Sequence, residues 1–123
     1  MHIPLIRPAI AAAILMAGAS VLTSQQSTTR IPQFENDEVN VWRSVVVPNA
    51  PLVMHTHQHP RVIIPLAGGD MKIVTESGSS ETHHWERGKA YWLSTEEGKT
   101  RHADANAGET PIEVMVVELK KAN

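Results

Sequence analysis

Short apolar runs interrupted by turn-forming residues mark the chain from residue 39 onward. No stretch long enough for a helix repeats its apolar residues with the period of an α-helix, whereas Val, Ile, Trp and Tyr gather in brief runs. Pairs such as Pro48-Asn49, Gly68-Gly69 and Ser77-Gly78 separate these runs. The pattern predicts strands at 40–47, 52–57, 61–66, 70–75, 81–86, 90–93, 101–105 and 112–119. About eight short strands at spacings of about ten residues indicate an all-β sandwich or barrel.

The N-terminal segment has a different pattern. Arg7 is followed by an apolar run at 9–17 and by the small residues Ala17-Gly18-Ala19, which is the layout of a secretory signal peptide. A transmembrane anchor is the alternative, but the apolar stretch 10–22 is shorter than the roughly 20 residues that a spanning helix needs. We therefore expect residues 1–19 to be removed, leaving an exported protein, periplasmic or secreted, without membrane attachment.

The mature chain divides into an arm and one domain. Residues 20–38 are polar and mixed, with many Ser, Thr and Gln residues, and they predict a linker or flexible N-terminal arm. The remainder, 39–121, is the predicted β-barrel domain, and a chain of this length buries one core.

Composition excludes several classes of function. The sequence has no cysteine, so disulfides, thiolate metal sites and cysteine nucleophiles are ruled out. The formal net charge is −2, and the Lys and Arg residues are scattered rather than gathered into a stripe, so nucleic-acid binding has no electrostatic footprint.

A cluster of histidines suggests metal chemistry. In a strand, His55 and His57 project from the same face about 7 Å apart. A third ligand must then come from another strand, and His102 in the predicted strand 101–105 is the natural candidate. Neutral imidazoles bind Fe, Zn, Mn, Cu and Ni, so the expected cofactor is one divalent ion of undetermined identity. His83 and His84 are adjacent, which turns them to opposite faces, and we interpret both as surface residues.

The spacing of these residues resembles the two sequence motifs of the cupin superfamily. The first motif corresponds to His55-x-His57, position 61 and Gly68; the second corresponds to Gly88, the apolar run 90–93, His102 and Asn106. The resemblance covers residues 39–120. It implies a cupin-type double-stranded β-helix, a jelly-roll barrel, holding a metal ion through His55, His57 and His102.

One position departs from the cupin pattern. Arg61 stands where the family has a glutamate ligand, and a guanidinium offers only donors. If the strand continues through Pro60, Arg61 points into the barrel, where it would suit an anionic ligand. The alternative is that the Pro60 bend turns Arg61 to the rim. His59 and Asn106 are further candidates for contact with a ligand or a metal-bound group; for His59, a role as fourth metal ligand is the lesser alternative.

The expected function follows from three neutral ligands that leave open positions on the ion. The leading hypothesis is a metal-dependent enzyme, oxygenase-like and a dioxygenase if iron is bound, that acts on a small oxygenated or anionic molecule; no catalytic residue can be assigned. The alternatives are a non-catalytic exported module that binds a metal ion or small ligand, and a purely structural ion. We also expect a homodimer that uses strand 112–119 or the first strand.

Overall fold

The computed structural model describes residue 18 and residues 27–121, which form eight strands and one short helix. The predicted signal peptide and the first part of the predicted arm lie outside the described residues, apart from Gly18. Among the described residues, no helix is long and apolar enough to cross a bilayer. The elements are β1 Thr29–Glu35, β2 Val39–Val46, β3 Arg61–Ala67, β4 Gly69–Thr75, β5 Ser80–Trp85, β6 Tyr91–Leu93, α1 Thr95–Lys99, β7 His102–Asn106 and β8 Ile112–Leu119.

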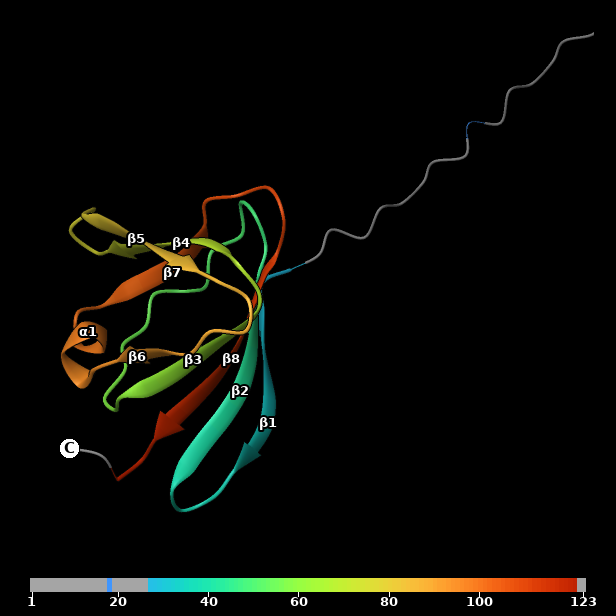
Figure 1. Ribbon diagram of the computed structural model, residues 1–123. Coiled ribbons are helices and arrows are strands. Elements are labelled where there is room, and N and C mark those ends of the chain that lie inside the picture. Colours follow the sequence, from blue (N-terminus) through green and yellow to red (C-terminus); the bar gives the residue numbers. More distant parts are fainter. Residues whose placement is uncertain (1–17, 19–26, 122–123) are drawn as a thin grey trace, which may run out of the picture.

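Two antiparallel sheets face each other and form the body of the molecule (Figure 1). The larger sheet has the strand order β1-β2-β8-β3-β6, and the smaller has the order β5-β4-β7. The non-consecutive neighbours, such as β2 beside β8, are the crossovers of a jelly roll. The fold is therefore the all-β jelly-roll barrel that the sequence predicts.

The core lies between the sheets because every second residue of the facing strands is apolar. In β8, Ile112, Val114 and Val116 are buried while their neighbours are half-buried. In β2 the buried positions include Trp42 and Val46. Because successive side chains in a strand point to opposite faces, every second side chain of these strands lies in the core. The core cluster consists of Trp42, Val46, Ile63, Met71, Trp85, Ile112, Val114 and Val116.

The predicted arm is partly wrong, because residues 29–35 form strand β1. This strand pairs with β2 from Thr29 opposite Val45 to Glu35 opposite Asn40. All its side chains but Ile31 are exposed. Backbone hydrogen bonds to the edge of β2, rather than apolar burial, hold it in place, so its composition resembles that of a linker.

Two segments differ from the sequence prediction: residues 52–57 do not form a regular strand, and a short helix, which the sequence did not predict, follows β6. Segment 52–57 makes only isolated bonds, including a single antiparallel bridge between His55 and His102. The ladder ends there because the chain before β7 turns into α1. Ser94 caps that helix, and Glu97 closes the capping box. Figure 1 shows α1 at one end of the barrel, between β6 and β7.

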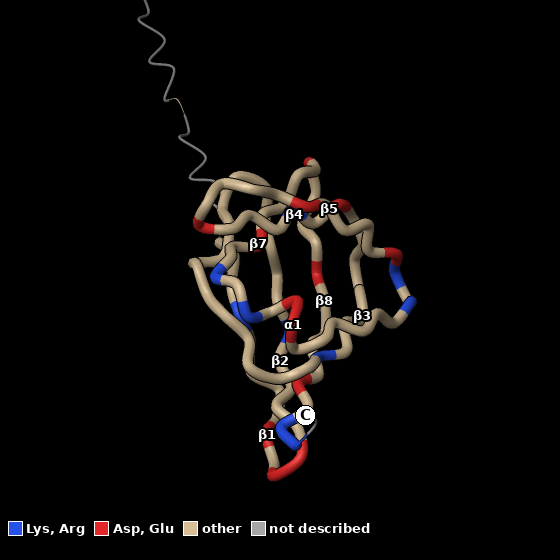
Figure 2. Tube along the Cα trace, turned by 90° about the vertical axis from the view of Figure 1, so that its left-hand side faces the viewer, with Lys and Arg blue, Asp and Glu red and all other residues tan. Residues whose placement is uncertain are grey.

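The order of strands in the larger sheet limits which strands could pair with a second copy in the predicted dimer. Strand β8 is paired on one side with β2 and on the other with β3, so it has no edge to offer a second copy. The edges of the larger sheet are β1 and β6. The predicted first strand, 40–47, corresponds to β2, which pairs with β1 and β8, so neither of the two strands expected at an interface has a free edge, and the homodimer itself stays a prediction. Acidic and basic positions are interspersed along the trace in Figure 2.

Candidate metal centre

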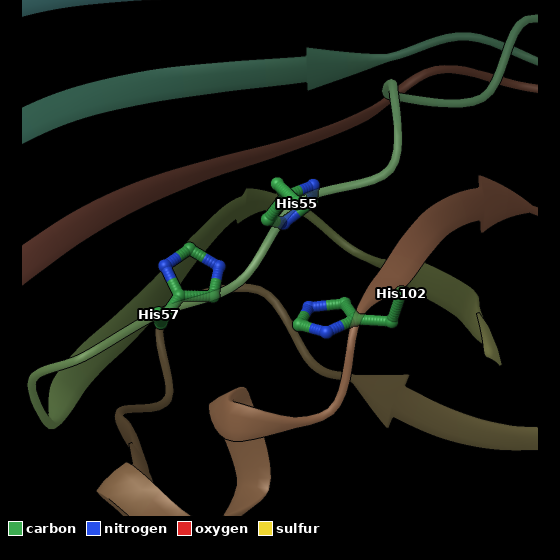
Figure 3. Close-up of side chains that lie close together, drawn as sticks. All are labelled: His55, His57 and His102. Atoms are coloured by element: carbon green, nitrogen blue, oxygen red, sulfur yellow. The ribbon is translucent and has the colours of Figure 1, made fainter. Parts of the chain in front are cut away.

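The structure brings together the three histidines that the sequence singles out. One ring nitrogen from each of His55, His57 and His102 lies within 4.8 Å of the others. His55 and His57 come from the segment before β3, and His102 begins β7; Figure 3 shows the three rings turned toward one another. The ring centroids are 4.6 Å apart for His55 and His102 and 4.8 Å apart for His55 and His57.

Backbone pairing explains this convergence. The amide of His55 donates to the carbonyl of His102 at 2.8 Å, and the amide of His102 donates back at 3.0 Å. The amide of His57 donates to the carbonyl of Gly98, at the end of α1, at 2.8 Å. The two segments thus hold the histidines in register although 52–57 is not a regular strand.

The hydrogen bonds of the rings leave the Nε2 atoms free to bind an ion. Nδ1 of His55 lies 2.7 Å from the carbonyl of Val53, and Nδ1 of His102 lies 2.7 Å from the carbonyl of Thr100. A carbonyl only accepts, so each neutral ring donates through Nδ1 and keeps a lone pair on Nε2. Nε2 of His55 and Nε2 of His57 are buried without a hydrogen-bond partner among the described residues. Histidines that bind a metal ion through one ring nitrogen commonly donate the N–H of the other nitrogen to a carbonyl or carboxylate, as these rings do. The residues present therefore fit a divalent ion.

Burial keeps the rings in the form that binds metal. The His57 side chain is 5% exposed, and burial, reinforced by the positive charge of Arg61, lowers its pKa to about 2. Burial also lowers the pKa of His55. Both rings are therefore neutral at pH 7 and can donate a lone pair without first losing a proton.

Arg61 points into the barrel, as one of the two sequence hypotheses proposes. Its side chain is buried and lines a cavity of about 150 Å³ between the two sheets, next to His57 and His102. Its Nε is buried without a hydrogen-bond partner in the described structure, and burial lowers its pKa. Arg30 of β1 lines the same cavity, with its guanidinium carbon 5.1 Å from the centre of the Trp42 ring. Two cationic groups therefore face the cavity beside the histidines.

The short helix α1 packs closely on the site at Gly98. A Cβ at this position would lie 2.7 Å from Cβ of His57 and 3.3 Å from Nη2 of Arg61. Gly98 is therefore needed for the close approach of the helix to His57.

We expect Gly98→Ala to displace His57 and to weaken metal binding by at least about 10-fold, as changes around metal ligands do. Equilibrium dialysis against Zn²⁺ measures this effect. Gly78→Ala is a control for glycine loss alone, because no atom lies within 4 Å of the Cβ it would add, although its positive φ carries a cost of its own. Equal affinity in Gly98→Ala and the unmodified protein would contradict the packing argument.

The other predicted site residues have different positions. His59 is half-buried and is not among the residues that line the cavity. The side-chain amide of Asn106 donates to the carbonyls of Val46 and Thr110 and accepts from the amide of Gly108, so it holds the turn after β7. Asn106 does not line the cavity either.

His83 and His84 do face opposite ways, but only one of them is a surface residue. The His84 side chain is 68% exposed and hydrogen-bonds Asp70. His83 lines the cavity, with its ring nearly parallel to Trp85 and its Nε2 3.4 Å from Oε1 of Glu81. Interpreting His83 as a surface residue is therefore wrong.

Sequence reasoning also missed Asp104, Arg30 and Glu118. Asp104 follows His102 by two residues, and residues so spaced in a strand lie on the same face. This spacing could have placed Asp104 beside the histidine cluster from the sequence alone. Glu118 lies with its Oε2 3.8 Å from Nδ1 of His57, and it is opposite Arg61 in the β3–β8 ladder. Arg30 had no signal, because nothing in the polar segment around it predicts a strand.

Comparison with known proteins finds similarity in structure rather than in sequence. No family model matches the sequence, and no curated protein matches it. A cupin domain from Bordetella pertussis superposes with a TM-score of 0.67 and 23% identity, over 79% of this chain and 97% of that one. An RmlC-like cupin protein from Methanocaldococcus jannaschii, described as a double-stranded β-helix, gives a TM-score of 0.59 and 14% identity, over 79% and 84% of the two chains.

A polyketide cyclase from Streptomyces resistomycificus has the same fold. It gives a TM-score of 0.56 and 20% identity, over 78% of this chain and 67% of that one. At these identities the similarity establishes architecture and not activity. Together with the sheet topology, the comparisons show that this chain has the double-stranded β-helix fold of the cupin superfamily.

Proposed function

We propose that this protein is a metal-dependent enzyme that binds one divalent ion through His55, His57 and His102 and acts on a small anionic, oxygenated molecule in the adjoining cavity. The observation that carries the proposal is the shared orientation of the histidines. Two of the rings direct Nδ1 at a backbone carbonyl, and the third directs Nδ1 toward the carboxylate of Glu118. For His55 and His102 this leaves a lone pair on Nε2, and the Nε2 of His57 is buried without a hydrogen-bond partner among the described residues.

Two arginines of the cavity favour an anion as the second component of the site, although the carboxylates of Glu81, Glu97 and Asp104 line the same cavity. Arg61 and Arg30 both line it. A buried guanidinium whose Nε has no partner can donate two parallel hydrogen bonds to a carboxylate. The volume of about 150 Å³ matches a cavity that in another protein holds benzene, so a small organic acid fits. Apolar walls from Ile63, Met71 and Val114 complete the pocket.

One further group supports catalysis over simple capture. A bound divalent ion supplies a Lewis acid that polarises an oxygen ligand or lowers the pKa of a water molecule. His83 lines the same cavity, with its Nε2 3.4 Å from Oε1 of Glu81, so it is placed to exchange a proton with a ligand bound there. A purely structural ion would need neither the two arginines of the cavity nor this histidine.

Metal analysis followed by a turnover assay tests the proposal. Protein dialysed against Fe²⁺, Zn²⁺ or Mn²⁺ should retain about one ion per chain, a ratio given by elemental analysis. Iron-loaded protein should then consume oxygen when acetylacetone, oxalate or succinate is added, with loss of the added compound followed by mass spectrometry. Ligand binding without consumption of any compound, whichever metal is loaded, would instead favour the exported binding module. Failure to retain any ion would refute the metal-dependent enzyme and a metal-binding module alike.

Arg61 provides a separate test of anion binding. Arg61→Gln should weaken the binding of succinate or oxalate by about 10- to 100-fold, because hydrogen bonds to a charged group contribute roughly 1.5–3 kcal/mol. Titration calorimetry measures the dissociation constant. Arg101→Gln is the matched control, because Arg101 pairs with Glu76 on the surface. Unchanged affinity in Arg61→Gln would remove Arg61 from the ligand site.

A further inference from the structure

Asp104 lies beside the histidine cluster, although its position has no place in the metal-binding pattern predicted from the sequence. It follows His102 by two residues in β7, so both side chains project from the same face of the strand. Its Oδ2 is 3.7 Å from Nε2 of His55, and its Oδ1 is 4.0 Å from Nε2 of His102. The side chain is 20% exposed and lines the cavity.

The chemistry of these contacts calls for a cation between them. In the form of His55 and His102 that binds a metal ion, each ring donates through Nδ1 to a backbone carbonyl and carries a lone pair on Nε2. A carboxylate also offers only lone pairs. The two Nε2 atoms and the Asp104 carboxylate are all acceptors, so they repel one another unless a hydrogen or a metal ion lies between them. The arrangement therefore fits a shared positive charge.

The distances agree with a shared ion. Ligand atoms that bind one ion at about 2.0–2.2 Å lie roughly 3–4 Å from each other, depending on the angle at the ion. The separations of 3.7 Å, from Oδ2 to His55, and 4.0 Å, from Oδ1 to His102, fall within this range, although each involves a different oxygen and the set of mutually close ligand atoms among the described residues consists of the three histidines alone. Among the described residues, no hydrogen bond reaches the Asp104 carboxylate, and no ion pair within 4.0 Å joins it to Arg61 or Arg30, although its negative charge acts on Arg61 and opposes the lowering of the Arg61 pKa by burial.

We propose that Asp104 is the fourth protein ligand of the metal centre, a carboxylate supplied by β7 in place of the one that Arg61 displaces at the start of β3. This assignment rests on the proposed metal site. It gives the site three imidazoles and one carboxylate, which reduces the charge of a bound divalent ion from +2 to +1. Such a mixed set suits Fe²⁺ and Mn²⁺ as well as Zn²⁺. With Arg61 and Arg30 beside it, the cavity still favours an anion.

Metal affinity and cobalt spectra of paired variants test the assignment without any activity assay. The unmodified protein, Asp104→Ala and Asp104→Asn are titrated with Co²⁺ and Mn²⁺. We expect Asp104→Ala to bind about 100-fold more weakly or worse, since changes to groups behind the ligands already cost 10- to 100-fold. The visible absorption of its Co²⁺ complex should also change, because loss of a ligand alters the coordination. Glu81→Gln is the matched control, because Glu81 is another carboxylate of the same cavity.

The outcomes separate this assignment from the metal site itself. If the unmodified protein binds no ion, the metal site is wrong and the role of Asp104 falls with it. If the unmodified protein binds Co²⁺ and Asp104→Ala binds it within threefold and with the same spectrum, only the Asp104 assignment is overturned. Thermal melts of the metal-free proteins check folding. Should Asp104→Ala fail to fold, Asp104→Asn, which preserves the side-chain shape, decides by the same two criteria.

Discussion

Replacing His57 with alanine is expected to abolish metal binding, with a loss of affinity greater than about 100-fold. His57 and His102 are the two buried histidines of the cluster. The Nε2 of His57 has no hydrogen-bond partner in the described structure. Its backbone bond to Gly98 does not depend on the side chain. The substitution therefore removes a ligand atom while leaving the chain path supported, and even outer groups of metal sites cost 10- to 100-fold when changed.

Two neighbouring histidines serve as matched controls for His57→Ala. His83→Ala removes an imidazole from the same cavity wall, and His59→Ala removes one from the same segment. Equilibrium dialysis with Zn²⁺ and elemental analysis should give about one ion per chain for both controls and none for His57→Ala. Circular dichroism melts establish that each variant is folded. Retention of a full equivalent by folded His57→Ala would show that the cluster is not the metal site.

The metal-free protein is expected to lose about 2 kcal/mol of unfolding free energy from His57 alone between pH 7.0 and pH 5.0. Burial holds the pKa of His57 at about 2 in the folded state, whereas an unfolded histidine titrates near 6.5. Below pH 6.5 the unfolded chain therefore binds a proton that the folded chain excludes. Stability falls with pH by up to about 1.4 kcal/mol per unit for such a group. His55, whose pKa is also lowered, contributes in the same direction.

Urea denaturation at pH 7.0, 6.0 and 5.0 in the presence of a chelator measures this dependence. The window lies above the range in which most carboxyl groups titrate, so the histidines dominate it. His57→Gln should flatten the curve, and His84→Gln, which replaces a histidine whose side chain is 68% exposed, serves as the comparison for loss of a surface imidazole. The same slope in His57→Gln and the unmodified protein would contradict the assignment of the pH dependence to His57.

Much of the barrel can be predicted from local pattern because its strands alternate between a buried and an exposed face. The predicted strands at 61–66, 70–75 and 112–119 agree closely with β3, β4 and β8, where alternation follows directly from the position of the core. Strand β1 was missed because its exposed side chains contribute no alternation. Helix α1 was missed because five residues are too few for a helical period, although Ser94 and Glu97 carry the signal of a capping box.

The candidate metal centre divides in the same way. By itself the sequence identified the three candidate ligands and the unusual Arg61, because His55, His57 and His102 belong to motifs whose spacing is read along the chain. Only the tertiary structure decided that Arg61 points inward, that His83 joins the cavity, and that Asp104 and Arg30 border the site. These contacts join strands that are distant in sequence, and which atoms meet depends on sheet register and on the direction of each side chain. Local pattern specifies the elements and their motifs, whereas packing specifies which groups face one another.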